Sequence, residues 1–398
     1  MILDVLMLSA VGLVLVRWLF LLVAAGIRGN TEVLPALTPA SITVVIPAYN
    51  EELVLEPTVL GVLASSNVDL RVLVIDDGSI DGTREIAERL AADHPQVQAI
   101  ILARNGGKPA ALNTGFHAAR TDLVASLDAD TVPAPDALSR LAAHFVDPKI
   151  AAAASNVKVG NRGSWLSRWQ SIEYISAIHL NRRALALLNT ITTVPGALAV
   201  WRKTLVLQCG GFSSETLSED TDLTLTLTRA GYRMEFVDQA IAYTQVPQSP
   251  GCLFRQRKRW LYGNLQCLWK HRGGFVDGPW ALRLLGLPNL AYTHFVVYLL
   301  FPLSALYLGH ATAHFSIAEL LLIGTALFSL DGFSCAVAYV IDKEALGELS
   351  EVPFQRFFFP FFLWGVFASV LIAFLRQRGM PWLRVERRSM DALPAPMP

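Results

Sequence analysis

Asp128 and Asp130 stand two residues apart after the apolar run LVASL, and together they could hold one hard cation. If the extended strand continues through them, both side chains point to the same side. Mg²⁺ and Mn²⁺ are commonly held by one or two carboxylates together with phosphate oxygens of a substrate, so the pair suits a ligand that carries a diphosphate. The alternative is a solvated turn, because so short a motif also arises by chance.

A second acidic pair, Glu219 and Asp220, stands in LSEDTDL at the start of a run with helical character. In the functional interpretation Asp220 is a general base that accepts the proton of an attacking hydroxyl group. The alternative is that both acids only complement the dipole in the first turn of a helix. The spacing in the sequence does not by itself place this pair beside Asp128.

Three further polar clusters stand out, and two of them could bind parts of a nucleotide. Asp76 and Asp77 follow VLVI and precede Gly-Ser, where a carboxylate can accept hydrogen bonds from a base or a ribose; a turn that leads into a helix is the alternative. Lys108 follows two glycines at the expected start of a helix, which suits a phosphate group. No Walker A pattern is present, and a surface loop is the alternative there. Tyr49 and Glu51 form the third cluster, after SITVVIPA.

The block FRQRKRW, residues 254–260, combines positive charge with aromatic side chains. One interpretation is a helix that lies on the membrane surface. In the other, Arg259 binds a departing diphosphate and Trp260 packs against a sugar ring. His310 and His314 are four residues apart, but no glutamate lies between them and an apolar run lies beside them, so we interpret them as structural.

Short apolar runs that alternate with amphipathic stretches are expected to position these clusters. SITVVIPAYN, LRVLVIDDGS and TDLVASLDADT are typical of strands that end in polar turns, and TREIAERLAADHP and KPAALNTGFHAA are typical of the helices between them. The pattern predicts an α/β domain with a doubly wound, Rossmann-like sheet over residues 41–246. In such sheets ligands bind outside the carboxyl ends of the strands, so the clusters should meet at one edge.

The composition indicates that part of the chain lies in lipid. Of 398 residues, 53% are hydrophobic and 17% charged, whereas about 25% are charged in ordinary soluble domains. Residues 1–30 are expected to hold an inward-running transmembrane helix that ends at Arg28, a cleaved signal peptide being the alternative. Residues 286–380 are expected to hold further transmembrane helices, in the apolar runs Leu290–Leu308, Phe315–Ile341 and Phe357–Leu375.

The orientation of the C-terminal part stays open. Residues 247–285 are expected to lie along the inner membrane surface. Three membrane crossings after this segment would place the basic C-terminal tail outside, against the positive-inside tendency. That tail comprises residues 381–398 and the arginines just before them. Either Asp331 or Pro360 marks a run that does not simply span, or the tendency fails. Arg17 lies within the first span, and a charged side chain in the membrane is unfavourable unless that side chain faces other helices or water.

Charge and cysteine usage exclude other classes of protein. Lys plus Arg and Asp plus Glu are balanced at 33 each, so no basic excess indicates a nucleic-acid partner. The cysteines lack a CxxC pair, which is typical of reduced structural thiols rather than a disulfide framework or a zinc site. They are Cys209, Cys252, Cys267 and Cys335.

In order along the chain, VVIPAYNEE, VIDDGSIDGT, NGGKPAALN, DAD, GGF, SEDTDL and QRKRW resemble the motifs of the family 2 inverting glycosyltransferases with a GT-A fold. Within that family the chain is similar to the processive synthases of poly-β-1,6-N-acetylglucosamine, chitin oligosaccharides, hyaluronan and cellulose. The resemblance covers nearly the whole chain. It implies a GT-A type nucleotide-sugar domain embedded between transmembrane α-helices.

The resemblance implies a role for each matching residue. Asp220 would be the base, with Glu219 beside it, and Asp128 and Asp130 would hold Mg²⁺ or Mn²⁺. The family's TED motif is SED here, a change that keeps the base. The nucleotide-sugar contacts it implies are Ala48, Tyr49, Glu51, Asp76, Asp77, Lys108 and Asp128. The acceptor and diphosphate contacts, in the family's QxxRW motif, are Gln256, Arg257, Arg259 and Trp260.

The reaction implied is a single displacement that moves a sugar from a UDP-sugar, in the first place UDP-N-acetylglucosamine, to a growing β-linked polysaccharide, coupled to export. The protein would be a multi-pass protein of the inner (plasma) membrane with a cytoplasmic catalytic domain. Arg17 and Asp331 are candidates to line the path of the polymer. The resemblance leaves room for an accessory membrane subunit.

Two other functions remain open at this stage. QxxRW also occurs in ceramide glucosyltransferases, so the chain could instead transfer a single sugar to a lipid, such as a sphingolipid or a polyprenyl phosphate. A transport or scaffold protein with a degenerate sugar-binding domain is the second alternative. Every expected acidic and basic position is filled, which argues against degeneration.

Overall fold

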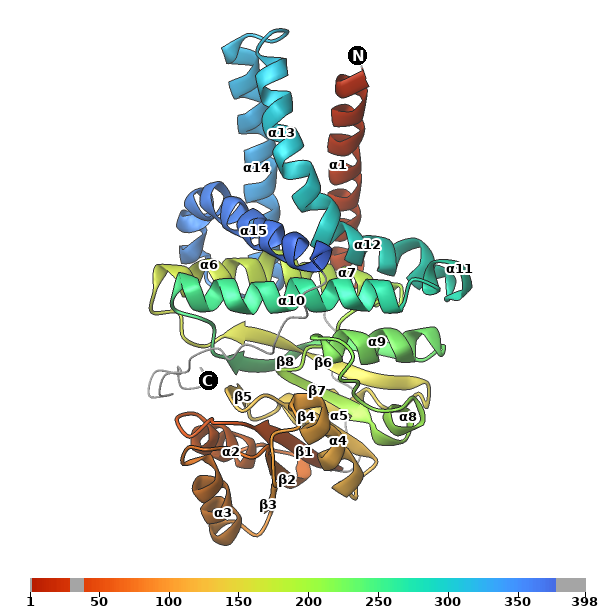
Figure 1. Ribbon diagram of the computed structural model, residues 1–398, viewed down its shortest axis with the longest axis vertical. Helices are drawn as coiled ribbons and strands as arrows, with labels where there is room; N and C mark the ends of the chain where they lie inside the picture. The colour runs from red at the N-terminus through yellow and green to blue at the C-terminus, as the bar shows by residue number, and fades with distance from the viewer. Residues whose placement is uncertain (1, 29–38, 377–398) are drawn as a thin grey trace.

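The computed structural model describes residues 2–28 and 39–376 of the chain. Its elements form three levels along the long axis of the molecule, as Figure 1 shows. An α/β domain lies at one end, a level of helices crosses over it, and upright helices project away from both. The upright helices come from the two ends of the sequence, and the α/β domain comes from the part between them.

The sheet of the α/β domain is mixed. Its strand order is β3-β2-β1-β4-β7-β6-β8-β5. The first four of these strands are parallel, and β7 runs antiparallel to both β4 and β6. The expected α/β sheet is therefore confirmed. Its uninterrupted run of parallel strands forms one half, whereas in the other half β6 and β8 are parallel to each other and β7 and β5 are antiparallel to their neighbours. The strands are β1 Ala40–Ala48, β2 Val68–Asp76, β3 Val97–Ile101, β4 Leu123–Leu127, β5 Thr131–Pro133, β6 Ile150–Val159, β7 Leu198–Arg202 and β8 Arg233–Thr244.

Helices cover both faces of the sheet because the central strands are apolar on both sides. In β1, Val44 and Ile46 point into one core cluster and Val45 into the other, as the two-residue period of a strand requires. The first cluster packs against α2 (Leu55–Leu63), α3 (Thr83–Asp93) and α5 (Ala137–Ala143). The second packs against α4 (Lys108–Ala118), α8 (Lys203–Gln208) and α9 (Glu219–Arg229).

The carboxyl ends of the parallel strands carry the predicted functional segments. Strand β1 lies between β2 and β4, so the strand order reverses there, and open α/β sheets bind ligands at such a reversal. Ala48, the last residue of β1, is in register with Asp76, the last residue of β2. Strand β4 ends at Leu127, directly before Asp128. The polar clusters therefore do meet at one edge of the sheet.

The crossing level contains the basic block of the sequence. Helix α10 begins after Ser249, whose hydroxyl accepts a hydrogen bond from the Cys252 backbone N–H, and Pro250 fits its first turn. Figure 1 shows α10 crossing above the sheet, with α6 and α7 at the same level. The segments of this level are α6 Trp165–Glu173, η1 Tyr174–His179, α7 Leu180–Leu187, α10 Pro250–Lys270, α11 Gly274–Asp277 and α15 Val352–Leu375.

The upright helices are α1 (Ile2–Arg28), α13 (Val297–Ala311) and α14 (Ile317–Ile341), as Figure 1 shows. Helix α13 continues a helical stretch that begins with the segments η2 Leu282–Gly286, α12 Leu287–Ala291 and η3 Tyr292–Val296. Within the described residues, the helices long and apolar enough to cross a membrane are Leu282–Ala311, Ile317–Ile341 and Leu346–Leu375. The three C-terminal apolar runs expected from the sequence thus lie in these helices.

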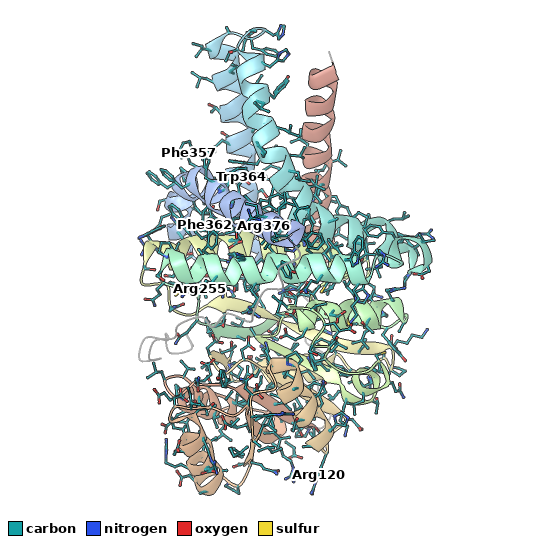
Figure 2. All side chains as sticks on the ribbon, viewed as in Figure 1. Arg120, Arg255, Phe357, Phe362, Trp364 and Arg376 are labelled. Atoms are coloured by element: carbon teal, nitrogen blue, oxygen red, sulfur yellow. The ribbon has the colours of Figure 1, made fainter. Side chains whose placement is uncertain are left out.

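The third of these runs, α15, does not stand with the upright helices. Its Phe359 packs against Leu253 and its Phe367 against Leu261, so it lies along α10. Figure 1 shows α15 crossing the base of α13 and α14, and Figure 2 labels Phe357, Phe362 and Trp364 along it. Helix α15 is long and apolar enough to cross a membrane, but it lies along the charged helix α10. That it is the run that does not simply span, the alternative raised at Pro360, stays a prediction.

A buried ionic cluster ties the helices to the α/β domain through the linker that joins α14 to α15. Lys158 of β6 contacts Glu344 at 2.7 Å and Asp342 at 3.6 Å. Arg162 contacts Glu344 at 2.8 Å, and His179 Nδ1 lies 3.2 Å from Asp342 Oδ2. The linker is therefore held to β6 and η1 by several charged groups at once.

Candidate active site

The Asp128-Ala129-Asp130 segment forms a tight turn between β4 and β5. The Thr131 backbone N–H donates to the Asp128 carbonyl oxygen at 3.0 Å, and the Asp128 N–H donates to the Ala197 carbonyl oxygen. The extended strand does not continue through this pair, because the chain must reverse to bring β5 against β8. Both carboxylates nevertheless line the same cavity.

Lys108 joins two acidic segments that are far apart in the sequence. Its ammonium nitrogen lies 2.6 Å from Asp128 Oδ1 and 3.1 Å from Glu219 Oε1. Lys108 is the first residue of α4 and Glu219 the first of α9, so two helix starts meet at the end of β4. Burial opposes the charged form, but Asp128 and Glu219 outweigh it and raise the pKa of Lys108. The lysine is therefore a fixed positive charge at this point.

Asp220 lies in the first turn of α9 with its carboxylate held in place. Its Oδ1 accepts from the Thr221 backbone N–H at 2.7 Å, and its Oδ2 accepts from the Gly196 N–H at 3.2 Å. Burial and the neighbouring Glu219 carboxylate raise the pKa of Asp220 to about 6. A carboxylate with a pKa near the working pH is suited to general-base catalysis.

The loop before β7 passes so close to Lys108 and Asp220 that only glycine fits at position 196. A Cβ atom on Gly196 would lie 2.7 Å from Lys108 Nζ and 3.7 Å from Asp220 Oδ2. The backbone can therefore reach both the lysine and the carboxylate only because the side chain is a hydrogen atom.

The loops that follow β1 and β2 are locked to each other. The Asn50 N–H donates to Ser79 Oγ at 2.9 Å, and the Ile80 N–H donates to Asn50 Oδ1 at 2.8 Å. The Glu51 N–H donates to Thr83 Oγ1 at 2.7 Å. These bonds place Tyr49 and Glu51 beside the Asp76 segment.

Asp77 holds the glycine loop that leads to Lys108. Its two carboxylate oxygens accept hydrogen bonds from the Gly106 and Gly107 backbone N–H groups, each at 2.8 Å. Burial raises the pKa of Asp77, and the two backbone bonds oppose that rise. Since both oxygens are engaged, the structure gives Asp77 a part in positioning Lys108. Its contact with a nucleotide stays a prediction.

Helix α10 presents the QxxRW residues toward the same cavity. Arg257 donates to Glu173 Oε2 at 2.7 Å and lies over the Trp260 ring, 4.3 Å from its centroid. Such stacking is favourable because the ring face is negative. Arg259 contributes a positive charge that favours the ionised form of Asp220 and so lowers its pKa, against the rise from burial.

One cavity of about 670 Å³ connects these groups to the upright helices. It is lined by most of the predicted site residues, namely Lys108, Asp128, Asp130, Glu219, Asp220, Gln256, Arg257, Arg259 and Trp260. The other predicted residues, at the ends of β1 and β2, do not line it; they are Ala48, Tyr49, Glu51, Asp76 and Asp77. The structure thus divides the predicted site into two neighbouring parts.

The cavity extends upward to two charged residues within the apolar helices. Arg17 of α1 donates to Asn289 Oδ1 at 3.0 Å and lies 4.9 Å from the centre of the Tyr292 ring. Asp331 of α14 pairs with Arg356 of α15 at 2.6 Å. Both line the cavity, so each faces other parts of the protein.

Sequence reasoning missed Glu173, Arg182 and Gly196, which also line the cavity. Glu173 and Arg182 lie on either side of the π-helical segment η1, and no motif marks them in the sequence. Gly196 follows a proline in TVPGAL, which indicates a turn but not its location. The signal for these residues is their position in the tertiary structure.

Comparison with known proteins gives a family match and two named relatives. The model of the family described as Glycosyltransferase like family 2 matches residues 39–263. The poly-beta-1,6-N-acetyl-D-glucosamine synthase of Staphylococcus aureus (strain COL) is 32% identical over 228 residues, 57% of this chain and 55% of that protein. An N-acetylglucosaminyltransferase of Sinorhizobium fredii is 32% identical over 271 residues, 64% of this chain and 62% of that protein. The chain therefore matches little more than half the length of these relatives.

A solved structure shares the fold over nearly the whole chain. The mannosyltransferase PcManGT from Pyrobaculum calidifontis, in complex with GDP-Man and Mn²⁺, has a TM-score of 0.67. The match covers 95% of this chain and 99% of that chain at 21% sequence identity. The likeness extends beyond the α/β domain to the helical levels, because that domain alone is too short to account for the coverage.

Proposed function

The chain belongs to the family Glycosyltransferase like family 2 and has a GT-A type fold, and from this premise we propose that it is a membrane-embedded inverting glycosyltransferase that extends a β-linked polysaccharide from a UDP-sugar. The observation that carries the proposal is the position of Asp220. A partly buried carboxylate with a pKa of about 6 lines the same cavity as Asp128, Lys108 and Trp260.

The chemistry proposed is a single displacement at the anomeric carbon. Asp220 takes the proton of the acceptor hydroxyl as that oxygen forms its bond to the anomeric carbon. The bond from this carbon to the diphosphate oxygen breaks, and the nucleoside diphosphate leaves with the electron pair. The Gly196 and Thr221 N–H groups hold the carboxylate in one orientation. Attack opposite the leaving group inverts an α-linked donor to a β-linked product.

A divalent cation fits the two aspartates. Asp128 and Asp130 line one cavity, whereas the described residues contain no group of three or more His, Cys, Asp or Glu side chains that could hold a metal ion. Mg²⁺ and Mn²⁺ are often bound in this manner, by few carboxylates and by substrate phosphate oxygens. When bound, the ion would neutralise charge on the diphosphate. Lys108 and Arg259 supply positive charge at the same place.

The donor proposed is UDP-N-acetylglucosamine. The two relatives named above carry N-acetylglucosamine in their names. Tyr49, Glu51 and Asp76 would bind the nucleotide at the ends of β1 and β2, where open α/β sheets bind such ligands. UDP-glucose is the next candidate, since no residue that separates the two sugars is recognisable by its spacing.

The membrane is proposed to begin at the crossing level. With α1, Leu282–Ala311 and α14 as spans, the catalytic domain and the end of α15 lie on one side. This arrangement keeps Arg376, directly after α15, on the inside, in line with the positive-inside tendency. Exposed aromatic side chains on α15, among them Phe354, Phe357 and Phe361, would face the acyl chains. The compartment proposed is the cytoplasmic face of the inner (plasma) membrane.

Export of the polymer is proposed to follow the cavity. Arg17 and Asp331 line it above Asp220, and neither is left to face lipid alone. Charged and amide side chains offer hydrogen bonds to the hydroxyl groups of a saccharide within an otherwise apolar region. An accessory membrane subunit would act beyond this path.

Transfer of one sugar to a lipid remains the second candidate, because the cavity reaches the base of the upright helices where a lipid head group could enter. The product separates the two functions. Purified protein in detergent or vesicles should be supplied with Mg²⁺ or Mn²⁺ and radiolabelled UDP-N-acetylglucosamine or UDP-glucose, beside an Asp220→Asn control. A long water-soluble polymer that is absent in the control supports the proposal. A single-sugar glycolipid moves the function to the alternative.

A further inference from the structure

Arg182 of α7 is a buried cation without a hydrogen-bond partner among the described residues. Only 8% of it is exposed, and its Nη1 atom is fully buried and unpaired. Its guanidinium lies 5.7 Å from the centre of the Phe236 ring, which offers no oxygen. The next residue differs, because Arg183 donates to the Ala25 carbonyl oxygen and pairs with Asp238. Helix α7 therefore carries one satisfied and one unsatisfied arginine.

An unsatisfied buried guanidinium is unfavourable, so it indicates a missing partner. Burial lowers the pKa of Arg182 to about 10, and the nearby Asp220 carboxylate opposes that fall. The group thus stays charged at neutral pH while most of its water is removed. Its N–H groups need an oxygen acceptor, and the cavity that they line is where one can be supplied.

Other buried atoms around the same cavity also lack partners. They include the acceptor oxygens Gln256 Oε1 and Asn264 Oδ1 and the donor Arg257 Nε. A ligand that satisfies all of them must both donate and accept hydrogen bonds. The cavity is lined by six basic and six acidic side chains, and two of the basic ones, Lys108 and Arg259, are already assigned to the diphosphate of the donor. No excess of positive charge is left for an anionic acceptor. A neutral saccharide, with many hydroxyl groups, fits both requirements.

We propose that Arg182 binds the acceptor sugar, donating from its guanidinium to a saccharide oxygen while Asp220 receives the proton of the attacking hydroxyl. This inference rests on the proposed function and deepens it by naming a neutral saccharide, rather than a lipid phosphate, as the acceptor at this site. Most of the residues assigned to the nucleotide lie outside the cavity, and Arg182 lies near Asp220, which is proposed to take the proton of the acceptor hydroxyl, so Arg182 faces the acceptor.

The test separates acceptor binding from donor turnover. Full-length Arg182→Gln protein in detergent is supplied with UDP-N-acetylglucosamine, and UDP release is measured without a primer and with an N-acetylglucosamine oligosaccharide. Loss of a hydrogen bond from a charged group should raise the KM for the primer about tenfold or more. Release of UDP to water and the KM for the donor should stay within about twofold of the unmodified protein. An unchanged KM for the primer, or an equal fall in both activities, would overturn the inference.

Two comparisons keep the result specific. Arg183→Gln removes the neighbouring buried arginine, which does not line the cavity, and should lower thermal stability without raising the KM for the primer. Arg182→Lys keeps the positive charge but loses the planar guanidinium, so its affinity for the primer should lie between those of Arg182→Gln and the unmodified protein. If polyprenyl phosphate replaces the oligosaccharide as the preferred acceptor and needs Arg182, the neutral-saccharide assignment is wrong. Failure of the unmodified protein to consume any donor would instead contradict the proposed function itself.

Discussion

The ammonium group of Lys108 lies 2.6 Å from Asp128 and joins it to Glu219, so one positive charge contacts both a proposed metal ligand and the acid beside the proposed base. Lys108 also favours the ionised form of Asp220. This relationship links three segments through one side chain, and its removal should affect donor binding and proton transfer together.

Lys108→Met should raise the KM for the donor and shift the acid limb of the pH profile upward. The second effect follows because the lysine opposes the rise in the pKa of Asp220, and its loss makes that carboxylate harder to ionise. The measurement is kcat/KM for the donor from pH 5 to pH 9. Lys149→Met, at an exposed position, is the matched control. A fall in rate that is uniform across pH would contradict the link to Asp220.

The rate of transfer should depend on pH through Asp220. The base acts when deprotonated, so activity should reach a plateau above the pKa of about 6 and fall about tenfold per pH unit below it. Asp220→Asn should lower kcat by about 10² to 10⁴ and remove this limb. The profile should be recorded with the protein checked for folding at each pH. An acid limb that persists in the variant would assign it to another group.

Gly263→Ala should disturb the contact between α10 and the segment before α9. A Cβ atom there would lie 2.2 Å from Ser218 Oγ and 2.8 Å from the Leu217 carbonyl carbon, and backbone cannot move aside cheaply. Overpacking of this kind costs about 1 to 3 kcal/mol. Because Ser218 precedes the base, kcat should fall as well as the melting temperature. Gly163→Ala, where nothing lies within 4 Å, should change neither.

Lys158→Met should destabilise the attachment of the helices to the α/β domain. It leaves Asp342 and Glu344 buried with one partner fewer, and breaking such buried pairs costs about 3 to 5 kcal/mol. The control Arg84→Met breaks the exposed pair with Glu88, which solvent screens, so it should change stability little. Thermal unfolding in detergent measures both.

The same cluster should make the protein labile to acid. Burial raises the pKa of both acids, but nearby positive groups outweigh burial and lower the pKa of each in the folded protein. At Asp342 these groups are His179 and Lys158. At Glu344 they are Arg162 and Lys158. An acid whose pKa is lower in the folded than in the unfolded protein stabilises the fold when the pH is above its unfolded-state pKa. This stabilisation is lost as the pH falls through its folded-state pKa. The acid transition should weaken in Lys158→Met. An unchanged transition would exclude the cluster as its cause.

The orientation of α15 can be measured by labelling single cysteines. A cysteine at Arg376, after α15, should react with a membrane-impermeant reagent only from the side of the catalytic domain. A cysteine at Thr312, in the turn between α13 and α14, should react only from the opposite side. Cys209, the one native thiol that is not buried, is first replaced by serine. Labelling of both positions from the same side would contradict the arrangement of spans.

Much of the fold followed from local patterns. The strands around Val44, Val72 and Val124 are short apolar runs that end in polar turns, and such runs carry their signal within a few residues. The apolar runs near the C-terminus were likewise recognisable by length. The antiparallel insertion of β7 between β4 and β6 was not, because pairing partners are set by the packing of distant segments.

The candidate site was likewise predictable only in part from the sequence. The types and order of Asp128, Lys108, Asp220 and Trp260 were fixed by the sequence, because motifs of charged residues at the ends of apolar runs are local features. That Lys108 lies between Asp128 and Glu219 was decided by the tertiary structure, which brings two helix starts to the end of one strand.

By itself the sequence determined which chemical groups this protein has and which parts of it are apolar enough for lipid. Only the tertiary structure decided that α15 lies along α10 and that Arg182 Nη1 is buried with no hydrogen-bond partner among the described residues. The physical reason is that burial and electrostatic neighbours arise from contacts across the whole chain. Composition and spacing describe each segment alone, whereas the pKa of Asp220 depends on Glu219, Lys108 and Arg259 together.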